Sequence, residues 1–136
     1  MNLAELINCA QTAEVCFKEY EFGFFPNFVI TDIARITGVN IRGVTKIITS
    51  DAIRHIIKTH GTEDEKKRGQ KPISYSDIEL IPRIVANFDQ VEKGREKHGQ
   101  SVVFTKNIDG VDYSVAMKYF NNGGNAKLEV RTMFAK

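Results

Sequence analysis

The hydrophobic positions of this chain follow two different periods, one in its first part and another in its last. Up to about residue 87, apolar residues recur three or four positions apart, which is the spacing of one face of an α-helix. From Ser101 onward, apolar and polar residues alternate, as they do in a strand with one buried face. The change of period predicts helices first and strands last.

The alternating part contains strand-like runs separated by turn sequences. The runs cover residues 101–106, 113–120 and 127–134. Asn107-Ile-Asp-Gly110 and Asn121-Asn-Gly-Gly-Asn125 lie between them, and both have the chemistry of hairpin turns. We therefore expect an antiparallel meander. Helices and strands in separate blocks indicate an α+β fold, with N-terminal helices packed on one face of a C-terminal antiparallel sheet.

The first part of the chain predicts a series of short elements. Residues 3–20 have partial helical spacing and are expected to form one helix, followed by an aromatic, core-covering connector over residues 21–28. A short helix is expected from Thr31, which would cap it, to Gly38, which would end it. Residues 44–49 are rich in β-branched side chains, and they fit either a strand or the approach to the next helix.

A further helix is predicted over residues 52–60. Its apolar stripe consists of Ile53, Ile56 and Ile57. Ser50 and Asp51 can cap its start, and Gly61 is expected to end it in the left-handed conformation.

The region that follows predicts a loop and then a broken helix. Residues 61–72 are polar and mixed in charge, which is typical of a surface loop. Ser76 and Glu79 have the spacing of a capping box and predict the next helix start. Pro82 lacks the amide proton that a helix interior needs, so we expect a kink or a break there.

His55 and His60 are the chemically distinctive residues of the predicted helix. At about 100° per residue, His60 continues the isoleucine stripe, whereas His55 lies about 140° away from it. Because metal-binding helices place two histidines four positions apart on one face, we expect no metal site here. For His60 two interpretations are open: a hydrogen-bonded core histidine, or a general acid or base at the mouth of a cleft. His55 fits a solvated side chain.

The last predicted strand carries a hydroxyl group in its apolar face. Strict alternation divides its residues into one face with Leu128, Val130, Thr132 and Phe134 and another with Lys127, Glu129 and Arg131. Thr132 therefore interrupts an apolar face, as His60 does on its helix. If these two faces pack together, the imidazole and the hydroxyl meet at the seam between helix and sheet, where a small site could form.

Composition and charge indicate a single domain that is not strongly basic. The 136 residues, of which 42% are hydrophobic, suffice for one core. The formal net charge is +2 with both signs interspersed, so any contact with a nucleic acid must be local.

The cysteines and the N-terminal sequence bear on the cellular compartment in which the protein is expected. Cys9 and Cys16 would lie about 10 Å apart along one helix, too far for a disulfide, so free thiols and a reducing compartment are expected. The N-terminus lacks the pattern of a secretory leader, and no run reaches the roughly 18 apolar residues of a membrane span. We therefore expect a cytoplasmic protein with no membrane segment and no disulfide.

Five stretches, taken in order, resemble a known family. They are Thr37–Gly43, Ser50–Gly61, Arg68–Asp77, Ile81–Asp89 and Lys127–Met133. Together they resemble the phage-associated barnase/EndoU/colicin/RelE-like (BECR) nuclease domains over roughly residues 31–136, which leaves residues 1–30 as a helical N-terminal extension. The resemblance implies a BECR-like fold and a metal-independent ribonuclease without a cofactor. It also implies a phage head protein or a toxin module that acts in the host-cell cytoplasm.

The resemblance further implies site residues. The catalytic candidates are His60, His55, Thr132 and Lys58, and the substrate-binding candidates are Arg68, Gln70 and Arg131. A histidine can take the proton from a ribose 2′-OH, a second group can protonate the leaving 5′ oxygen, and a cation can stabilise the phosphorane. Because DNA lacks the 2′-OH, the expected substrate is RNA, with tRNA as one candidate. If the protein is a toxin, its expected partner is an immunity or antitoxin protein that covers the cleft.

Two alternatives remain open at this point. Residues 31–48 resemble a helix-turn-helix, with Ala34, Gly38 and Val44 at the small, turn and buried positions, which would indicate a DNA-binding protein. Gly43 would then lie inside the recognition helix, at a cost of about 1 kcal/mol. The other alternative is a catalytically inactive nuclease-like fold that binds proteins, as a phage component or an inhibitor of host defence.

Overall fold

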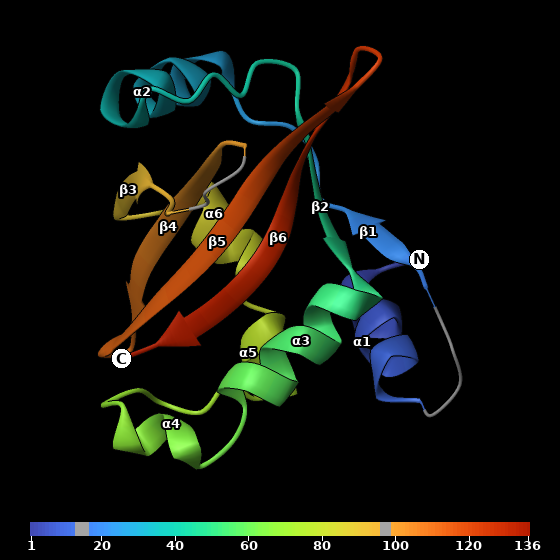
Figure 1. Ribbon diagram of the computed structural model, residues 1–136, viewed down its shortest axis with the longest axis vertical. Helices are drawn as coiled ribbons and strands as arrows, with labels where there is room; N and C mark the ends of the chain where they lie inside the picture. The colour runs from blue at the N-terminus through green and yellow to red at the C-terminus, as the bar shows by residue number, and fades with distance from the viewer. Residues whose placement is uncertain (13–16, 96–98) are drawn as a thin grey trace.

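The computed structural model describes residues 1–12, 17–95 and 99–136, and these form helices packed on one sheet (Figure 1). The helices are α1 (Leu3–Gln11), α2 (Asn27–Thr37), α3 (Ser50–His60), α4 (Asp64–Lys67), α5 (Tyr75–Ile78) and α6 (Ile81–Ala86). The strands are β1 (Glu19–Glu21), β2 (Thr45–Thr49), β3 (Gln90–Lys93), β4 (Ser101–Ile108), β5 (Val111–Asn122) and β6 (Asn125–Ala135). The predicted α+β class is confirmed.

The six strands lie in the order β1-β2-β6-β5-β4-β3. Strands β4, β5 and β6 make the antiparallel meander that the alternation predicted. The ambiguous run at residues 44–49 is strand β2, which pairs antiparallel with β1 and parallel with β6. Strand β3 extends the other edge by pairing with β4. The sheet is therefore wider than the predicted meander and contains one parallel pair.

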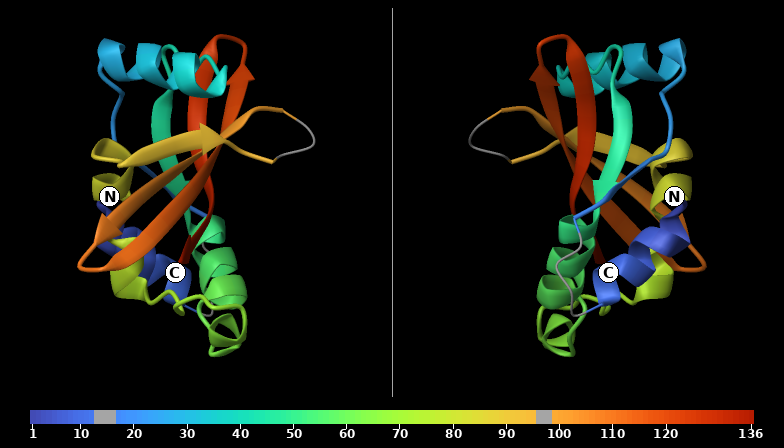
Figure 2. Two further views of the ribbon diagram at one scale, coloured as in Figure 1. Left: turned by 90° about the vertical axis from the view of Figure 1, so that its left-hand side faces the viewer. Right: turned by 90° about the vertical axis from the view of Figure 1, so that its right-hand side faces the viewer.

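One face of the sheet forms the core with the helices. Figure 2 shows α1 and α6 together on one side of the sheet. The fully buried core side chains include Leu6, Ile33, Ile53 and Ile84 from the helices and Phe104, Met117 and Val130 from the sheet. The side chains at alternate positions, among them Thr105, Ser114 and Ala116, line hollows on the opposite face.

A bulge in β6 changes which residues share a face. Ala116 of β5 pairs with Thr132 and Met117 pairs with Val130, so Arg131 is an extra residue. Beyond it the buried positions become Met133 and Ala135 in place of the expected 132 and 134. The prediction that Thr132 lies in the apolar face is therefore wrong, because the bulge reverses the alternation.

The N-terminal helix is shorter than predicted. Helix α1 ends at Gln11 and Glu19 already belongs to a strand, so the prediction of one helix over residues 3–20 is wrong. The estimate of about 10 Å between Cys9 and Cys16 assumed that single helix, so it no longer holds. Cys9 is not a free thiol but is disulfide-bonded, and Cys16 lies outside the described residues. The prediction of two free thiols is not confirmed, so it gives no support to a reducing compartment.

Helix α2 starts earlier than its sequence signals indicated. It begins at Asn27, and the Thr31 hydroxyl donates to the Asn27 carbonyl oxygen at 3.1 Å instead of capping the helix. Gly38 ends it in the left-handed conformation with φ of 76°, as predicted. The residues after Gly38 lead into strand β2 and form no second helix, so the helix-turn-helix interpretation is wrong.

Both ends of α3 differ in detail from the prediction. The cap is Thr49, whose hydroxyl oxygen accepts from the Ala52 amide at 3.1 Å, rather than Ser50 or Asp51. Gly61 ends the helix with φ of −99°, so it is not left-handed. A Cβ at Gly61 would lie 2.5 Å from the Ile57 carbonyl oxygen, so glycine is needed there for close backbone approach.

The region between α3 and the meander is more ordered than a polar loop. Helix α4 lies inside residues 61–72, and its Glu65 is fully buried. The capping box is formed by Ser74 and Asp77, two residues before the predicted pair. The break at Pro82 is confirmed, because α5 ends before it and α6 starts with this proline in its first turn.

In the part of the chain that the structure describes, no helix has both the length and the apolar character that crossing a membrane requires.

Candidate active site

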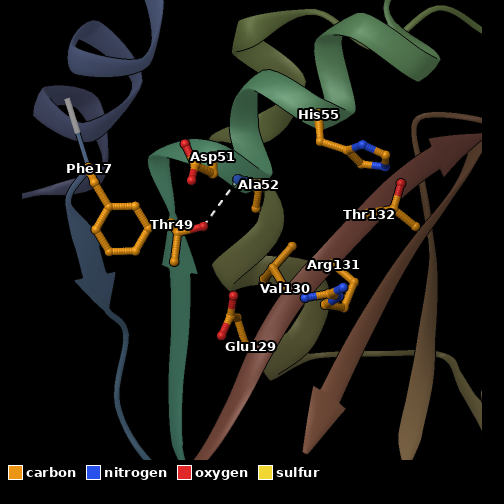
Figure 3. A pocket seen from close by; sticks show the side chains of 9 residues that line it. All are labelled: Phe17, Thr49, Asp51, Ala52, His55, Glu129, Val130, Arg131 and Thr132. Carbon is orange, nitrogen blue, oxygen red and sulfur yellow. Dashed lines mark hydrogen bonds between the residues drawn. The ribbon is translucent and has the colours of Figure 1, made fainter. Parts of the chain in front are cut away.

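A cavity of about 460 Å³ opens between α3 and β6 (Figure 3). Its position follows from the sheet register. Strand β2 pairs with β6 only as far as Ile47 opposite Glu129, and the chain then turns into α3 after Thr49. From that point the helix replaces the strand beside β6. The lining consists of Phe17, Thr49, Asp51, Ala52, His55, Glu129, Val130, Arg131 and Thr132.

His55, Arg131 and Thr132 meet at this cavity. In Figure 3 the His55 imidazole extends from α3 toward the Thr132 hydroxyl, and Arg131 projects from the neighbouring position of β6. The bulge brings Arg131 and Thr132 to the same side of the strand. The sequence analysis named all three residues as candidates, but it placed Arg131 and Thr132 on opposite faces.

The Thr132 hydroxyl is buried without a partner. Its Oγ1 has less than 1 Å² of accessible surface and makes no hydrogen bond to any described residue. A buried hydroxyl left unpaired costs about 1–3 kcal/mol. The group is therefore suited to donate a hydrogen bond to something that the cavity binds.

Charges of both signs surround the cavity. Arg131 contributes a guanidinium, and the positive end of the α3 dipole also lies at the lining, since Asp51 and Ala52 belong to its first turn. The Asp51 carboxylate is paired with Arg54 at 2.9 Å. Glu129 supplies a second carboxylate to the lining. The sequence analysis did not name Glu129 as a candidate.

His60 lies farther along α3 and does not line this cavity. Its Nδ1 is 3.0 Å from Glu65 Oε2, and its side chain is only 15% exposed. Its ring centroid lies 6.0 Å from that of Phe134. The histidine that shares a cavity with Thr132 is therefore His55, whereas His60 has the hydrogen-bonded setting of a core histidine.

Glu65 contacts two of the candidate residues, His60 and Arg68, and the sequence analysis did not name it. Its side chain is fully buried, and it lies 3.0 Å from His60 and 3.3 Å from the Arg68 guanidinium. A charged residue in a polar loop gives no sequence signal of burial. Arg68 is 55% exposed and is paired with this carboxylate, and Lys58 is exposed on α3 outside the cavity lining.

Two further hollows continue across the open face of the sheet. One of about 290 Å³ shares Arg131 and Thr132 with the first cavity. The next, of about 580 Å³, shares Arg95 with the second hollow and includes Gln70. The Gln70 Oε1 is buried and has no hydrogen-bond partner within the described part of the chain. Each hollow shares lining residues with the next, so the three are neighbours, and we refer to them together as the groove.

No group of three or more metal-ligating side chains is arranged to hold an ion among residues 1–12, 17–95 and 99–136.

The fold and its open sheet face place the protein in a class. Helices packed on a six-stranded, mostly antiparallel sheet form an α+β architecture that is consistent with a BECR-like nuclease domain. A family model described as phage-Barnase-EndoU-ColicinE5/D-RelE like nuclease 3 matches residues 27–136, and the chain belongs to this family. The suspected resemblance is therefore confirmed, and it extends a few residues farther toward the N-terminus than expected. A search of curated proteins and a search of solved structures found no match.

Proposed function

We propose that this protein is a ribonuclease that cleaves RNA at the cavity formed by His55, Arg131 and Thr132. The family establishes a nuclease domain of phage association, for which a nucleic acid is the expected substrate. The observation that supports the finer proposal is the collection, in one cavity, of an imidazole, a guanidinium and an unpaired hydroxyl. These are the groups that phosphate transfer from a ribose 2′-OH needs.

The proposed reaction uses only side chains of this chain. A base takes the proton of the 2′-OH, the 2′ oxygen bonds to phosphorus, and the bond from phosphorus to the 5′ oxygen breaks. An acid gives a proton to that 5′ oxygen, so the products are a 2′,3′-cyclic phosphate and a 5′-OH. His55 transfers one of the two protons. Because Asp51 is already paired with Arg54, we assign the other transfer to Glu129.

The remaining groups stabilise charge. Arg131 and the Thr132 hydroxyl contact the phosphoryl oxygens, where negative charge grows in the transition state. In this scheme His60 and Glu65 hold the end of α3 against β6 and take no part in proton transfer. We propose that no metal ion takes part, since the side chains supply both proton transfers and charge stabilisation.

The test compares the two histidines of α3. Purified protein is incubated with total tRNA and with a defined single-stranded RNA in EDTA. We expect wild type to cleave, His55→Ala to lose at least about 100-fold in rate, and His60→Ala to retain most activity once its fold is verified by circular dichroism. Loss of activity in folded His60→Ala with retention in His55→Ala would transfer the role to His60. Intact RNA with every substrate would favour the protein-binding alternative.

If cleavage is confirmed, the biological setting follows as a further proposal. A phage-associated ribonuclease would act on RNA in the host cytoplasm, with tRNA as a first candidate. If the protein is a toxin, a cognate immunity or antitoxin protein would cover the groove. Protection of RNA by a co-purified inhibitor would test this proposal.

A further inference from the structure

Phe17 forms part of the cavity wall although most of its side chain faces solvent. It is 65% exposed and lines the same cavity as His55, Arg131 and Thr132 (Figure 3). An exposed phenylalanine loses the favourable free energy of burying an aromatic ring. Beside a cavity with a guanidinium, such a ring has the right chemistry to stack on a nucleic-acid base.

The backbone next to Phe17 is held firmly at the junction of β2 and α3. The Lys18 amide donates to Ser50 Oγ at 3.1 Å, and the Ser50 amide donates to the Lys18 carbonyl oxygen at 2.9 Å. Glu19 then pairs with Thr49, the last residue of β2. The same junction carries Thr49 and Asp51 of the cavity lining, so the contacts of Lys18 and Glu19 hold the chain directly after Phe17 beside the cavity.

Phe17 also lies outside the part of the chain that the family model matches. That match begins at residue 27, so α1, β1 and Phe17 precede it. The cavity is therefore built from two sources. The matched part supplies His55, Arg131 and Thr132, and the N-terminal segment adds an aromatic wall.

We propose that Phe17 stacks on the base of a nucleotide bound at this cavity, and that the N-terminal segment thereby makes the protein selective for unpaired RNA. The inference rests on the proposed ribonuclease function. A base inside a duplex already stacks on both neighbours and presents no free face to the ring, whereas a base in a loop or single strand does. The ring recognises any base by its π face, so it selects strandedness rather than sequence.

A fluorescence experiment tests this contact without requiring cleavage. The chain has no tryptophan, so Phe17→Trp places one reporter at the cavity. Phe28→Trp is the matched control, because Phe28 is 71% exposed on α2 and does not line the cavity. Each variant is titrated with a short single-stranded 2′-O-methyl RNA, which lacks the 2′-OH and stays intact, and with the same strand in a duplex.

Stacking predicts that the single strand quenches Phe17→Trp and leaves Phe28→Trp unchanged, and that the duplex quenches neither. Phe17→Ala should bind the fluorescently labelled single strand about tenfold more weakly than wild type, with Phe28→Ala equal to wild type. Equal quenching of both tryptophans, or equal affinity of Phe17→Ala and wild type, would overturn the inference. If wild type cleaves RNA but Phe17→Trp is not quenched, the stacking inference fails and the ribonuclease stands. If Phe17→Trp is quenched but no RNA is cleaved, the contact stands and the ribonuclease fails.

Discussion

Replacing Thr132 by valine should make the protein more stable and less active at the same time. The substitution keeps the shape of the side chain and removes only the hydroxyl oxygen, which has no hydrogen-bond partner among the residues that the structure describes. An unpaired buried hydroxyl costs about 1–3 kcal/mol, and Thr132 itself is only half-buried, so we take the lower end. The expected gain in the free energy of unfolding is about 1 kcal/mol, or about 4 °C in Tm.

The matched control is Thr105→Val on the same open face of the sheet. The Thr105 hydroxyl lies 3.0 Å from Ser114 Oγ, so its removal breaks a hydrogen bond and should cost about 1 kcal/mol. Urea unfolding at neutral pH measures both variants against wild type. Under the same conditions, Thr132→Val should cleave RNA about 100-fold more slowly, because the donor to the phosphoryl group is gone. A loss of stability in Thr132→Val equal to that of Thr105→Val would refute the reasoning, since it would mean that the Thr132 hydroxyl is already paired.

Two further predictions concern buried charges. Glu65→Ala removes a buried carboxylate that contacts His60 and Arg68. The lost contacts and the cavity left behind should together lower the free energy of unfolding by about 3 kcal/mol, and a loss below about 1 kcal/mol in urea unfolding would contradict these buried contacts. Burial alone would raise the pKa of Asp77, but hydrogen bonds from Lys71, the Ser74 amide and Tyr113 outweigh it and hold the pKa below its ordinary value of 3.8. Ionised Asp77 therefore contributes stability that is present above pH 3.8 and is lost as the pH falls through the lower folded value. Asp77→Asn should cost about 2 kcal/mol at pH 7 and less at pH 3, and an equal cost at both pH values would contradict the pairing.

The alternation of the last third of the chain was enough to predict the meander. The runs ending in Lys106, Phe120 and Phe134 are strands, because one buried face imposes a period of two. The parallel pairing of β2 with β6 could not be predicted, since it joins segments far apart in sequence and depends on tertiary packing. The β-branched side chains of residues 44–49 alone could not decide whether this segment is a strand or the approach to a helix.

The sequence analysis named the residues of the candidate site but did not predict how they are arranged in space. His55, Arg131 and Thr132 were all named, but strict alternation set the last two on opposite faces, and a single extra residue in β6 brings them together. Strict alternation missed this bulge because apolar Phe134 fits it as well as Met133 and Ala135 fit the bulged strand. The burial of Glu65 was also invisible, because only its contacts with His60 and Arg68 distinguish it from the solvated charges around it.

The most direct measurement is the identity of the RNA ends that the wild-type protein produces in EDTA. Mass spectrometry of a defined single-stranded RNA after cleavage should find 2′,3′-cyclic phosphate on one fragment and a 5′-OH on the other. A strand with a single 2′-deoxy substitution at the cleaved nucleotide should remain intact at that position. Fragments that carry 5′-phosphate, or cleavage of the 2′-deoxy strand at the same position, would contradict attack by the 2′-OH at the His55 cavity.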